Sequence, residues 1–163
     1  MLSGNGLRIA VVTISDRAYR GEYEDLSGPK IKEIIDGSDL GAEVTVYVVP
    51  DEADMIRDVL LEKVSEGFDY ILTTGGTGVS PRDVTPEVTA EVCDRELPGI
   101  AETLRRESYK ETLFAMLSRG YSGVKGQTVL VNFPGSVKAV TLCTRLMLPI
   151  IPHGVKMLRG EGH

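Results

Sequence analysis

Apolar positions follow two different periods along this chain, and the change between them predicts strands separated by helices. Residues 7–14, LRIAVVTI, form a continuous β-branched run that is typical of a strand buried on both faces. Similar runs at 43–49, 68–74 and 127–133 predict three more strands. Over 51–67 apolar residues recur at helical spacing, which predicts the clearest helix of the chain.

Capping residues locate the starts of other helices. Ser27 precedes a predicted helix over 28–36, and a serine hydroxyl in that position accepts a hydrogen bond from a first-turn N–H. Thr85 is predicted to cap a following helix in the same way, and Asp51 is a suitable cap for the clearest helix. Further helices are predicted over 86–94, 99–117 and 137–147, with a short one after Pro152.

Strands that alternate with helices are typical of an α/β sandwich around a mostly parallel sheet. No repeat, low-complexity tract or change in composition suggests a linker, so residues 1–163 are interpreted as a single domain. In such sheets ligands bind outside the carboxyl ends of the strands. Functional residues are therefore expected in the loops that follow the predicted strands.

Charge and hydropathy argue against several classes of partner. The chain has 24 acidic and 18 basic residues, and this net charge of −6 argues against nucleic acid or an anionic membrane as the main partner. No apolar run approaches the roughly 20 residues of a membrane span. The first residues lack a signal-peptide pattern, so a cytoplasmic location is expected. Cys93 and Cys143 lie inside predicted helices and are interpreted as ordinary buried thiols.

A glycine-rich loop lies within residues 73–87, TTGGTGVSPRDVTPE. Gly75, Gly76, Thr77 and Gly78 follow a predicted strand, where backbone N–H groups can converge on an anion without interference from Cβ atoms. The loop does not match the dinucleotide fingerprint, and the chain has no P-loop motif. A plain strand-to-helix turn explains the glycines equally well.

Charged side chains also follow the predicted strands. Asp16 comes after the first strand, Asp51 after the second, and Arg82 and Asp83 after the third. Their convergence at one sheet edge suits Mg²⁺, which takes one or two protein carboxylates together with substrate phosphates. Simpler interpretations remain open: Asp51 as a helix cap, Asp16 as a turn cap and Asp83 as a solvated loop residue.

These motifs resemble, in order, those of the molybdopterin adenylyltransferases, the MogA and MoaB type proteins of molybdenum cofactor biosynthesis. The matching segments are ISDRA (14–18), VPDE (49–52), LTTGGTG and RDVTPE within 72–87, LSR (117–119) and NFPGSVKA (132–139). The resemblance covers nearly the whole chain. It implies a three-layer α/β/α sandwich, usually a homotrimer, that activates molybdopterin with ATP and Mg²⁺ and releases pyrophosphate.

The resemblance also implies roles for individual residues. Asp51 and Asp83 match the family's two functional carboxylates, which are catalytic and bind the metal, so it favours a metal role for Asp51 over a cap. The pterin and nucleotide pocket is matched by Ser15, Asp16, Gly75, Gly76, Thr77, Gly78, Arg82, Ser118, Arg119, Pro134, Gly135, Ser136 and Lys138. Phe133 and Val137 depart from the usual family pattern, which leaves the shape of that helix entrance open.

The implied chemistry needs no catalytic His, Ser or Cys. The attacking group would be the phosphate of molybdopterin, whose second pKa near ~6 leaves it largely ionised at neutral pH. The implied partners are molybdopterin, ATP and a downstream molybdenum insertase. Three rival interpretations are considered: a molybdopterin-binding paralogue with little transferase activity, a scaffold module of the same fold, and the related molybdenum-insertase domain. The glycine loop of that insertase domain usually reads TGGVS with a different acidic residue downstream, which argues against the third.

Overall fold

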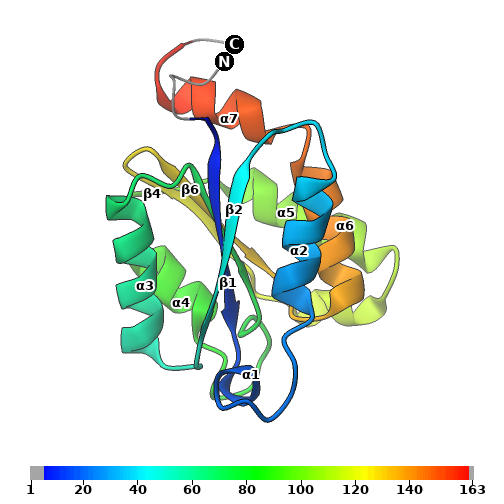
Figure 1. The fold of residues 1–163 in the computed structure, drawn as a ribbon. Helices are drawn as coiled ribbons and strands as arrows, with labels where there is room; N and C mark the ends of the chain where they lie inside the picture. Colours follow the sequence, from blue (N-terminus) through cyan, green and yellow to red (C-terminus); the bar gives the residue numbers. More distant parts are fainter. Residues whose placement is uncertain (1–5, 162–163) are drawn as a thin grey trace.

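The computed structural model describes residues 6–161 and has a six-stranded sheet between two layers of helices (Figure 1). The strands are β1 (Arg8–Ile14), β2 (Glu43–Val49), β3 (Tyr70–Thr74), β4 (Arg95–Glu96), β5 (Ser122–Lys125) and β6 (Thr128–Phe133). Their order is β2-β1-β3-β6-β5-β4. Strands β2, β1, β3 and β6 pair in parallel, whereas β5 pairs antiparallel with both β6 and β4. The predicted α/β sandwich with a mostly parallel sheet is confirmed.

Helices cover both faces of the sheet. They are α1 (Asp16–Tyr19), α2 (Ser27–Asp36), α3 (Ala53–Ser65), α4 (Thr85–Val92), α5 (Pro98–Tyr109), the 3₁₀ helix η1 (Leu113–Leu117), α6 (Val137–Met147) and α7 (Ile151–Leu158). Figure 1 shows α3 and α4 on one face, α2, α5 and α6 on the other, and α7 at the end of the sheet opposite α1. None of the helices within residues 6–161 has the length and apolar character needed to cross a bilayer.

Each central strand serves two cores, because successive side chains point to opposite faces of a sheet. In β1, Ile9 and Val11 belong to the core under α2 and α6, whereas Ala10 and Val12 belong to the core under α3 and α4. All four are fully buried. This explains why the strand reads as a continuous apolar run rather than as an alternating one.

The structure differs from the predicted elements at several places. The helix expected over 99–117 is divided into α5 and η1, where the Thr112 side chain accepts a hydrogen bond from the N–H of Phe114 at 3.3 Å. Strands β4 and β5 were not predicted, because they are short and β5 contains a glycine. The first turn after β1 is a short helix, α1, capped by Ser15, whose hydroxyl accepts from the N–H of Ala18 at 3.2 Å.

The predicted caps Ser27 and Thr85 are wrong, and the alternative interpretation of Asp51 as a cap is excluded. The Ser27 hydroxyl donates instead to the carbonyl of Gly135 at 2.6 Å and so ties the start of α2 to the loop after β6. The cap positions of α3 and α4 are Glu52 and Val84, and neither makes a capping side-chain bond, so neither Asp51 nor Thr85 is a cap. Ser27 and Asp51 form hydrogen bonds with loops that are distant in the sequence, because the folded sheet brings those loops against them.

The two cysteines are free thiols, as expected. Cys143 is buried in α6, whereas Cys93 lies just beyond the last residue of α4 and is only partly buried. Burial raises the pKa of each thiol to about 12. Both therefore stay protonated at neutral pH and have no nucleophilic role.

Asn132 in β6 holds a buried polar network beside the loops at the sheet edge. Its Nδ2 donates to the hydroxyls of Thr73 at 2.9 Å and Thr89 at 3.0 Å. Its Oδ1 accepts from the N–H of Tyr121 at 3.0 Å. One side chain thus joins β3, β6, α4 and the segment before β5.

We expect Asn132→Leu to lower the free energy of unfolding by about 2–3 kcal/mol, because it leaves the Tyr121 N–H and two hydroxyls without this buried partner. Gln127→Leu is the matched control: this exposed amide donates to the Leu158 carbonyl at 3.1 Å and has no other hydrogen-bond partner for its side chain within residues 6–161. Its cost should stay within ~0.5 kcal/mol. Equilibrium urea unfolding of both variants measures the difference, and equal losses would show that the network has no stabilising effect.

Candidate active site

The candidate site lies at the carboxyl ends of the parallel strands, where neighbouring β1 and β3 lead to opposite faces of the sheet. The chain leaves β1 toward α2 on one face and leaves β3 toward α4 on the other (Figure 1). Adjacent loops that diverge in this way leave a crevice, which is the usual ligand position in open α/β sheets. The loops after β2 and β6 border the same edge.

The glycine loop after β3 approaches its neighbours too closely for side chains. Gly75 and Gly76 have φ angles of +100° and +70°, a region that glycine enters without strain. A Cβ on Gly75 would overlap the carbonyl oxygen of Ile14, and a Cβ on Gly76 would overlap Oγ1 of Thr85. The two glycines are therefore required by backbone conformation and by close packing at once.

The same loop presents unpaired donors to a pocket. Within residues 6–161, the N–H groups of Gly76, Thr77 and Gly78 donate to no protein acceptor. The pocket that they border has a volume of about 380 Å³. Its lining is Gly75, Gly76, Thr77, Gly78, Val79, Phe114, Leu117, Ser118 and Gly135. Consecutive free N–H groups on a glycine loop form a concave binding site for anions such as phosphates.

Asp16 and Asp51 bind each other through reciprocal hydrogen bonds. The N–H of Asp16 donates to Oδ2 of Asp51 at 2.9 Å, and the N–H of Asp51 donates to Oδ1 of Asp16 at 3.0 Å. This pairing fixes the loop after β1 to the loop after β2. It also explains why Asp51 does not cap α3: its carboxylate is directed toward the neighbouring loop.

Arg82 neutralises part of the acidic cluster. Its guanidinium pairs with Asp16 at 2.9 Å and with Glu52 at 3.0 Å. The hydrogen bond from Arg82 holds the pKa of Asp16 below its ordinary value. Among residues 6–161, no basic side chain forms an ion pair with Asp51 or Asp83. These two carboxylates therefore carry the uncompensated negative charge of the site.

The pKa of Asp51 is shifted in the opposite direction to that of Asp16. Burial raises its pKa, and the charges of Asp16 and Asp83 raise it further, although the hydrogen bond from the Asp16 N–H acts in the opposite direction. Asp83 is folded against its own loop, where its Oδ2 accepts from the N–H of Ser80 at 3.0 Å. A bound cation would relieve the repulsion around Asp51.

The donor set fits Mg²⁺. Asp51 and Asp83 supply hard oxygen ligands, and Oδ1 of Asp51 accepts no hydrogen bond from residues 6–161. The described part of the chain has no group of three or more His, Cys, Asp or Glu side chains arranged for a metal. A small number of protein carboxylates, completed by substrate phosphates, is the usual way in which proteins hold Mg²⁺.

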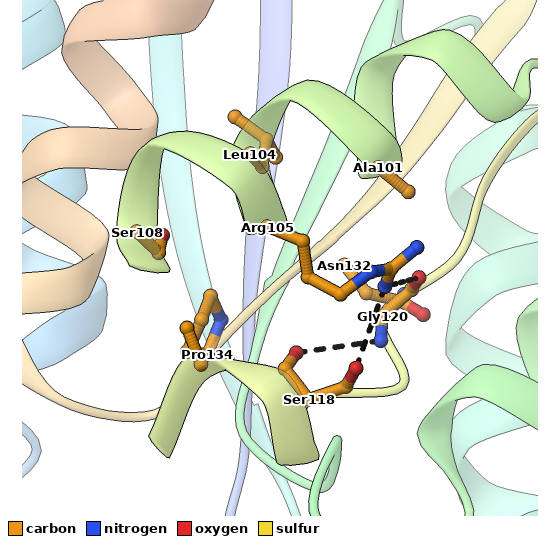
Figure 2. Close-up of a pocket in the computed structure, with 9 residues that line it drawn as sticks. Ala101, Leu104, Arg105, Ser108, Ser118, Gly120, Asn132 and Pro134 are labelled. Atoms are coloured by element: carbon orange, nitrogen blue, oxygen red, sulfur yellow. Dashed lines mark hydrogen bonds between the residues drawn. The ribbon is translucent and has the colours of Figure 1, made fainter. Parts of the chain in front are cut away.

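Arg119 and Arg105 support the loops rather than face open solvent. Arg119 donates to the carbonyls of Gly78 and Asp83, both at 2.8 Å, and pairs with Glu87. Arg105 donates to the carbonyl of Gly120 at 2.9 Å (Figure 2). The sequence analysis did not identify Arg105, because a basic residue on an amphipathic helix gives no sign of its partner.

The remaining predicted residues lie around this core. Ser136 caps α6, since its hydroxyl accepts from the N–H of Ala139 at 3.1 Å, and Lys138 is exposed on the first turn of that helix. The Pro134 carbonyl accepts from the Thr74 hydroxyl at 2.7 Å. The structure thus gathers the predicted glycines, Ser118 and Gly135 around one pocket, while Lys138 does not line it.

A second hollow, beside Ser118 and Pro134, is too small for a substrate. It has a volume of about 20 Å³ and is bordered by Arg105, Ser108 and Asn132 (Figure 2). Such a space holds one water molecule. The pocket over the glycine loop is therefore the candidate substrate site at this edge of the sheet.

Comparison with known proteins agrees with this geometry. Residues 10–153 match the model of a family described as a probable molybdopterin binding domain. The chain belongs to this family. The match spans β1 to α7, so it includes every loop of the site, and family membership rests on nearly the whole fold rather than on one motif.

Individual members of the molybdopterin binding family are closely similar. The chain is 39% identical to a molybdopterin adenylyltransferase of Helicobacter pylori, over 95% of this chain and 89% of that protein. It is also 39% identical to the molybdenum cofactor synthesis protein cinnamon of Drosophila melanogaster, but spans only 26% of that protein's length. The crystal structure of MoaB from Thermus thermophilus superposes with a TM-score of 0.85 at 44% identity, over 94% of this chain and 97% of that one.

We expect Asp51→Asn to unfold no more easily than the parent at about pH 7 without metal ions, because it removes a charge that the folded site disfavours. A raised carboxyl pKa destabilises the fold above that pKa, so the advantage of the variant should fade as the pH falls toward 3.8. Asp16→Asn is the opposite control, since it removes the charge that pairs with Arg82. In urea unfolding with EDTA, the free energy of unfolding should decrease in the order Asp51→Asn, parent, Asp16→Asn. The reverse order would contradict the electrostatic description.

Proposed function

We propose that the protein is a molybdopterin adenylyltransferase, which transfers the adenylyl group of ATP to molybdopterin and releases pyrophosphate. The observation that carries this proposal is a pocket with three unpaired loop N–H groups beside two carboxylates that lack basic partners. Donors for phosphate and ligands for a divalent cation are what the joining of two phosphorylated substrates requires. Family membership and the Helicobacter pylori relative support the same activity.

The chain's own residues would bind and orient the phosphates. The N–H groups of Gly76, Thr77 and Gly78 would donate hydrogen bonds to phosphate oxygens. The start of α6, with Lys138 in its first turn, offers a second anion site. Asp51 and Asp83 would hold Mg²⁺, which neutralises phosphate charge when it is bound. Arg82 keeps Asp16 ionised, so the backbone bonds between Asp16 and Asp51 persist.

The reaction needs no protein base in this arrangement. A phosphate oxygen of molybdopterin attacks the α-phosphorus of ATP, and the bond from that phosphorus to the α–β bridging oxygen breaks. Pyrophosphate leaves with the electron pair. The attacking phosphate is already largely ionised at neutral pH, because its second pKa lies near ~6. The unreactive, protonated thiols of Cys93 and Cys143 agree with a mechanism without a protein nucleophile.

The deciding experiment is pyrophosphate release from ATP, with and without added molybdopterin, at several Mg²⁺ concentrations. We expect release that depends on molybdopterin, and a loss of about 100-fold or more in Asp51→Asn and Asp83→Asn, since a metal contributes several kcal/mol of charge stabilisation. Asp58→Asn, an exposed carboxyl on α3, is the matched control and should retain parental turnover. Molybdopterin binding without pyrophosphate release would favour the rival interpretation as a binding paralogue.

We further propose that the protein acts as a homotrimer in the cytoplasm and passes its product to a molybdenum insertase. Two hollows of about 390 and 450 Å³, with mostly apolar linings, lie away from the proposed site and share Leu97, Ile100 and Ile150. The first is bordered by α5 and the end of α6, and the second by α5, β4 and α7. An exposed apolar surface of this kind is typical of contacts between subunits. The Drosophila relative, of which this chain matches about a quarter, supports a link to further steps of cofactor synthesis.

Light scattering should give a solution mass three times that of one chain. Ile150→Asp is expected to shift this mass toward a single chain, because Ile150 is 42% exposed and borders both apolar hollows. Leu61→Asp, at a leucine that is 41% exposed on α3, is the matched control and should leave the trimer intact. A single-chain mass for the parent at micromolar concentration would show that the trimer prediction is wrong.

A further inference from the structure

Thr85 has a buried hydroxyl group that its packing does not explain. The residue is 0% exposed, and its Oγ1 has no hydrogen-bond partner among residues 6–161. A buried hydroxyl without a partner destabilises a protein, whereas valine has nearly the same shape and no polar atom to satisfy. Among residues 6–161 the other buried hydroxyl of this kind is that of Ser108, which borders the water-sized hollow in Figure 2 and interacts with the Cys143 thiol, whose pKa is raised by burial and lowered in part by this hydroxyl. Thr85 faces the candidate active site instead.

The surrounding backbone holds Thr85 in one place. Its N–H donates to the carbonyl of Gly76 at 3.2 Å, and its own carbonyl accepts from the Thr89 hydroxyl at 2.8 Å. Thr89 is in turn bound by Nδ2 of Asn132 at 3.0 Å. The hydroxyl of Thr85 therefore stands at the end of a fixed chain of hydrogen bonds that begins in β6.

The Thr85 hydroxyl and Asp51 meet at Gly76. A Cβ on Gly76 would overlap Oγ1 of Thr85 and would lie 3.2 Å from Oδ1 of Asp51. Oδ2 of Asp51 accepts from the N–H of Asp16, whereas Oδ1 accepts from no donor in residues 6–161. A donor without an acceptor and an acceptor without a donor thus flank the same glycine, and the absence of a side chain there leaves the space between them open.

We propose that Thr85 is a positioning residue: its hydroxyl, which has no partner among the described residues of this structure, donates to Oδ1 of Asp51 once Mg–ATP is bound and so orients this carboxylate for the Mg²⁺. This inference rests on the proposed function of the site. A ligand carboxylate that is hydrogen-bonded on its far side keeps one orientation, and loss of such a partner typically weakens metal binding about 10- to 100-fold. The stability lost by burying the hydroxyl is then explained by its effect on Asp51.

The test compares Thr85→Val, which removes the hydroxyl, with Thr85→Ser, which keeps it. Thr85→Ala serves in place of the valine variant should the larger methyl group press on Gly76. Thr144→Val is the matched control, since Thr144 is also fully buried in a helix, donates to the Val140 carbonyl at 2.6 Å and lies in α6. Three quantities are measured for each: the unfolding midpoint without ligand, Mn²⁺ binding in the presence of ATP by electron paramagnetic resonance, and the Mg²⁺ concentration that gives half-maximal pyrophosphate release.

We expect Thr85→Val to be at least as stable as the parent, yet to need about 10-fold more Mn²⁺ and Mg²⁺. Thr85→Ser should stay within about 2-fold of the parent for both metals, and Thr144→Val should bind both like the parent. Parental metal binding by Thr85→Val, or equal weakening by Thr85→Ser, would overturn the inference, because the hydroxyl would not be the cause.

The binding measurement separates this inference from the proposed function. If the parent binds Mn²⁺ with ATP in a manner that depends on the Thr85 hydroxyl but releases no pyrophosphate, the proposed activity is wrong and the role of Thr85 stands. If the parent releases pyrophosphate and Thr85→Val needs no additional metal, the activity stands and the role of Thr85 is wrong. A parent that binds no Mn²⁺ with ATP would overturn the role of Thr85.

Discussion

The close approach of the loop after β3 to the end of β1 is the constraint on which the site depends. Gly75 lies directly against the carbonyl of Ile14, and Gly76 lies against the hydroxyl of Thr85, so neither position has room for a side chain. The positive φ angles at both glycines turn the following N–H groups away from protein acceptors. One backbone packing requirement thus produces both the crevice and its unpaired donors.

Some of the carboxylates around this crevice are paired with a basic residue and stabilise the loops, whereas others have no such partner within residues 6–161 and are available to a ligand. Arg82 stabilises Asp16 and Glu52, which keep the loops together, but no basic residue of the described chain pairs with Asp51 or Asp83. Burial and neighbouring charge disfavour the ionised form of Asp51. A folded protein retains such an arrangement where a ligand relieves it, which is why perturbed carboxyls gather at functional sites.

Helix capping shows where reasoning from local sequence succeeds and where it does not. Ser136, directly before α6, caps that helix by accepting from the N–H of Ala139, as a serine in this local position typically does. Ser27 stands in an equally suitable position, but the loop after β6 lies against it and its hydroxyl bonds to Gly135. Asp51 is likewise drawn to the N–H of Asp16. Local preference decides the contact only where no distant segment offers a better one.

The sequence by itself determined where the four parallel strands lie, that they are buried on both faces, and which loop contains the glycines. These features depend on the period of apolar residues and on the conformational freedom of glycine. Only the tertiary structure decided which polar atoms pair: Asp16 with Asp51, Arg119 with the glycine loop, and Asn132 with three segments. It alone left Thr85 without a partner. A hydrogen bond requires its atoms to lie within a few tenths of an ångström of one geometry, and such placement between distant residues is set by the packed sheet and helices.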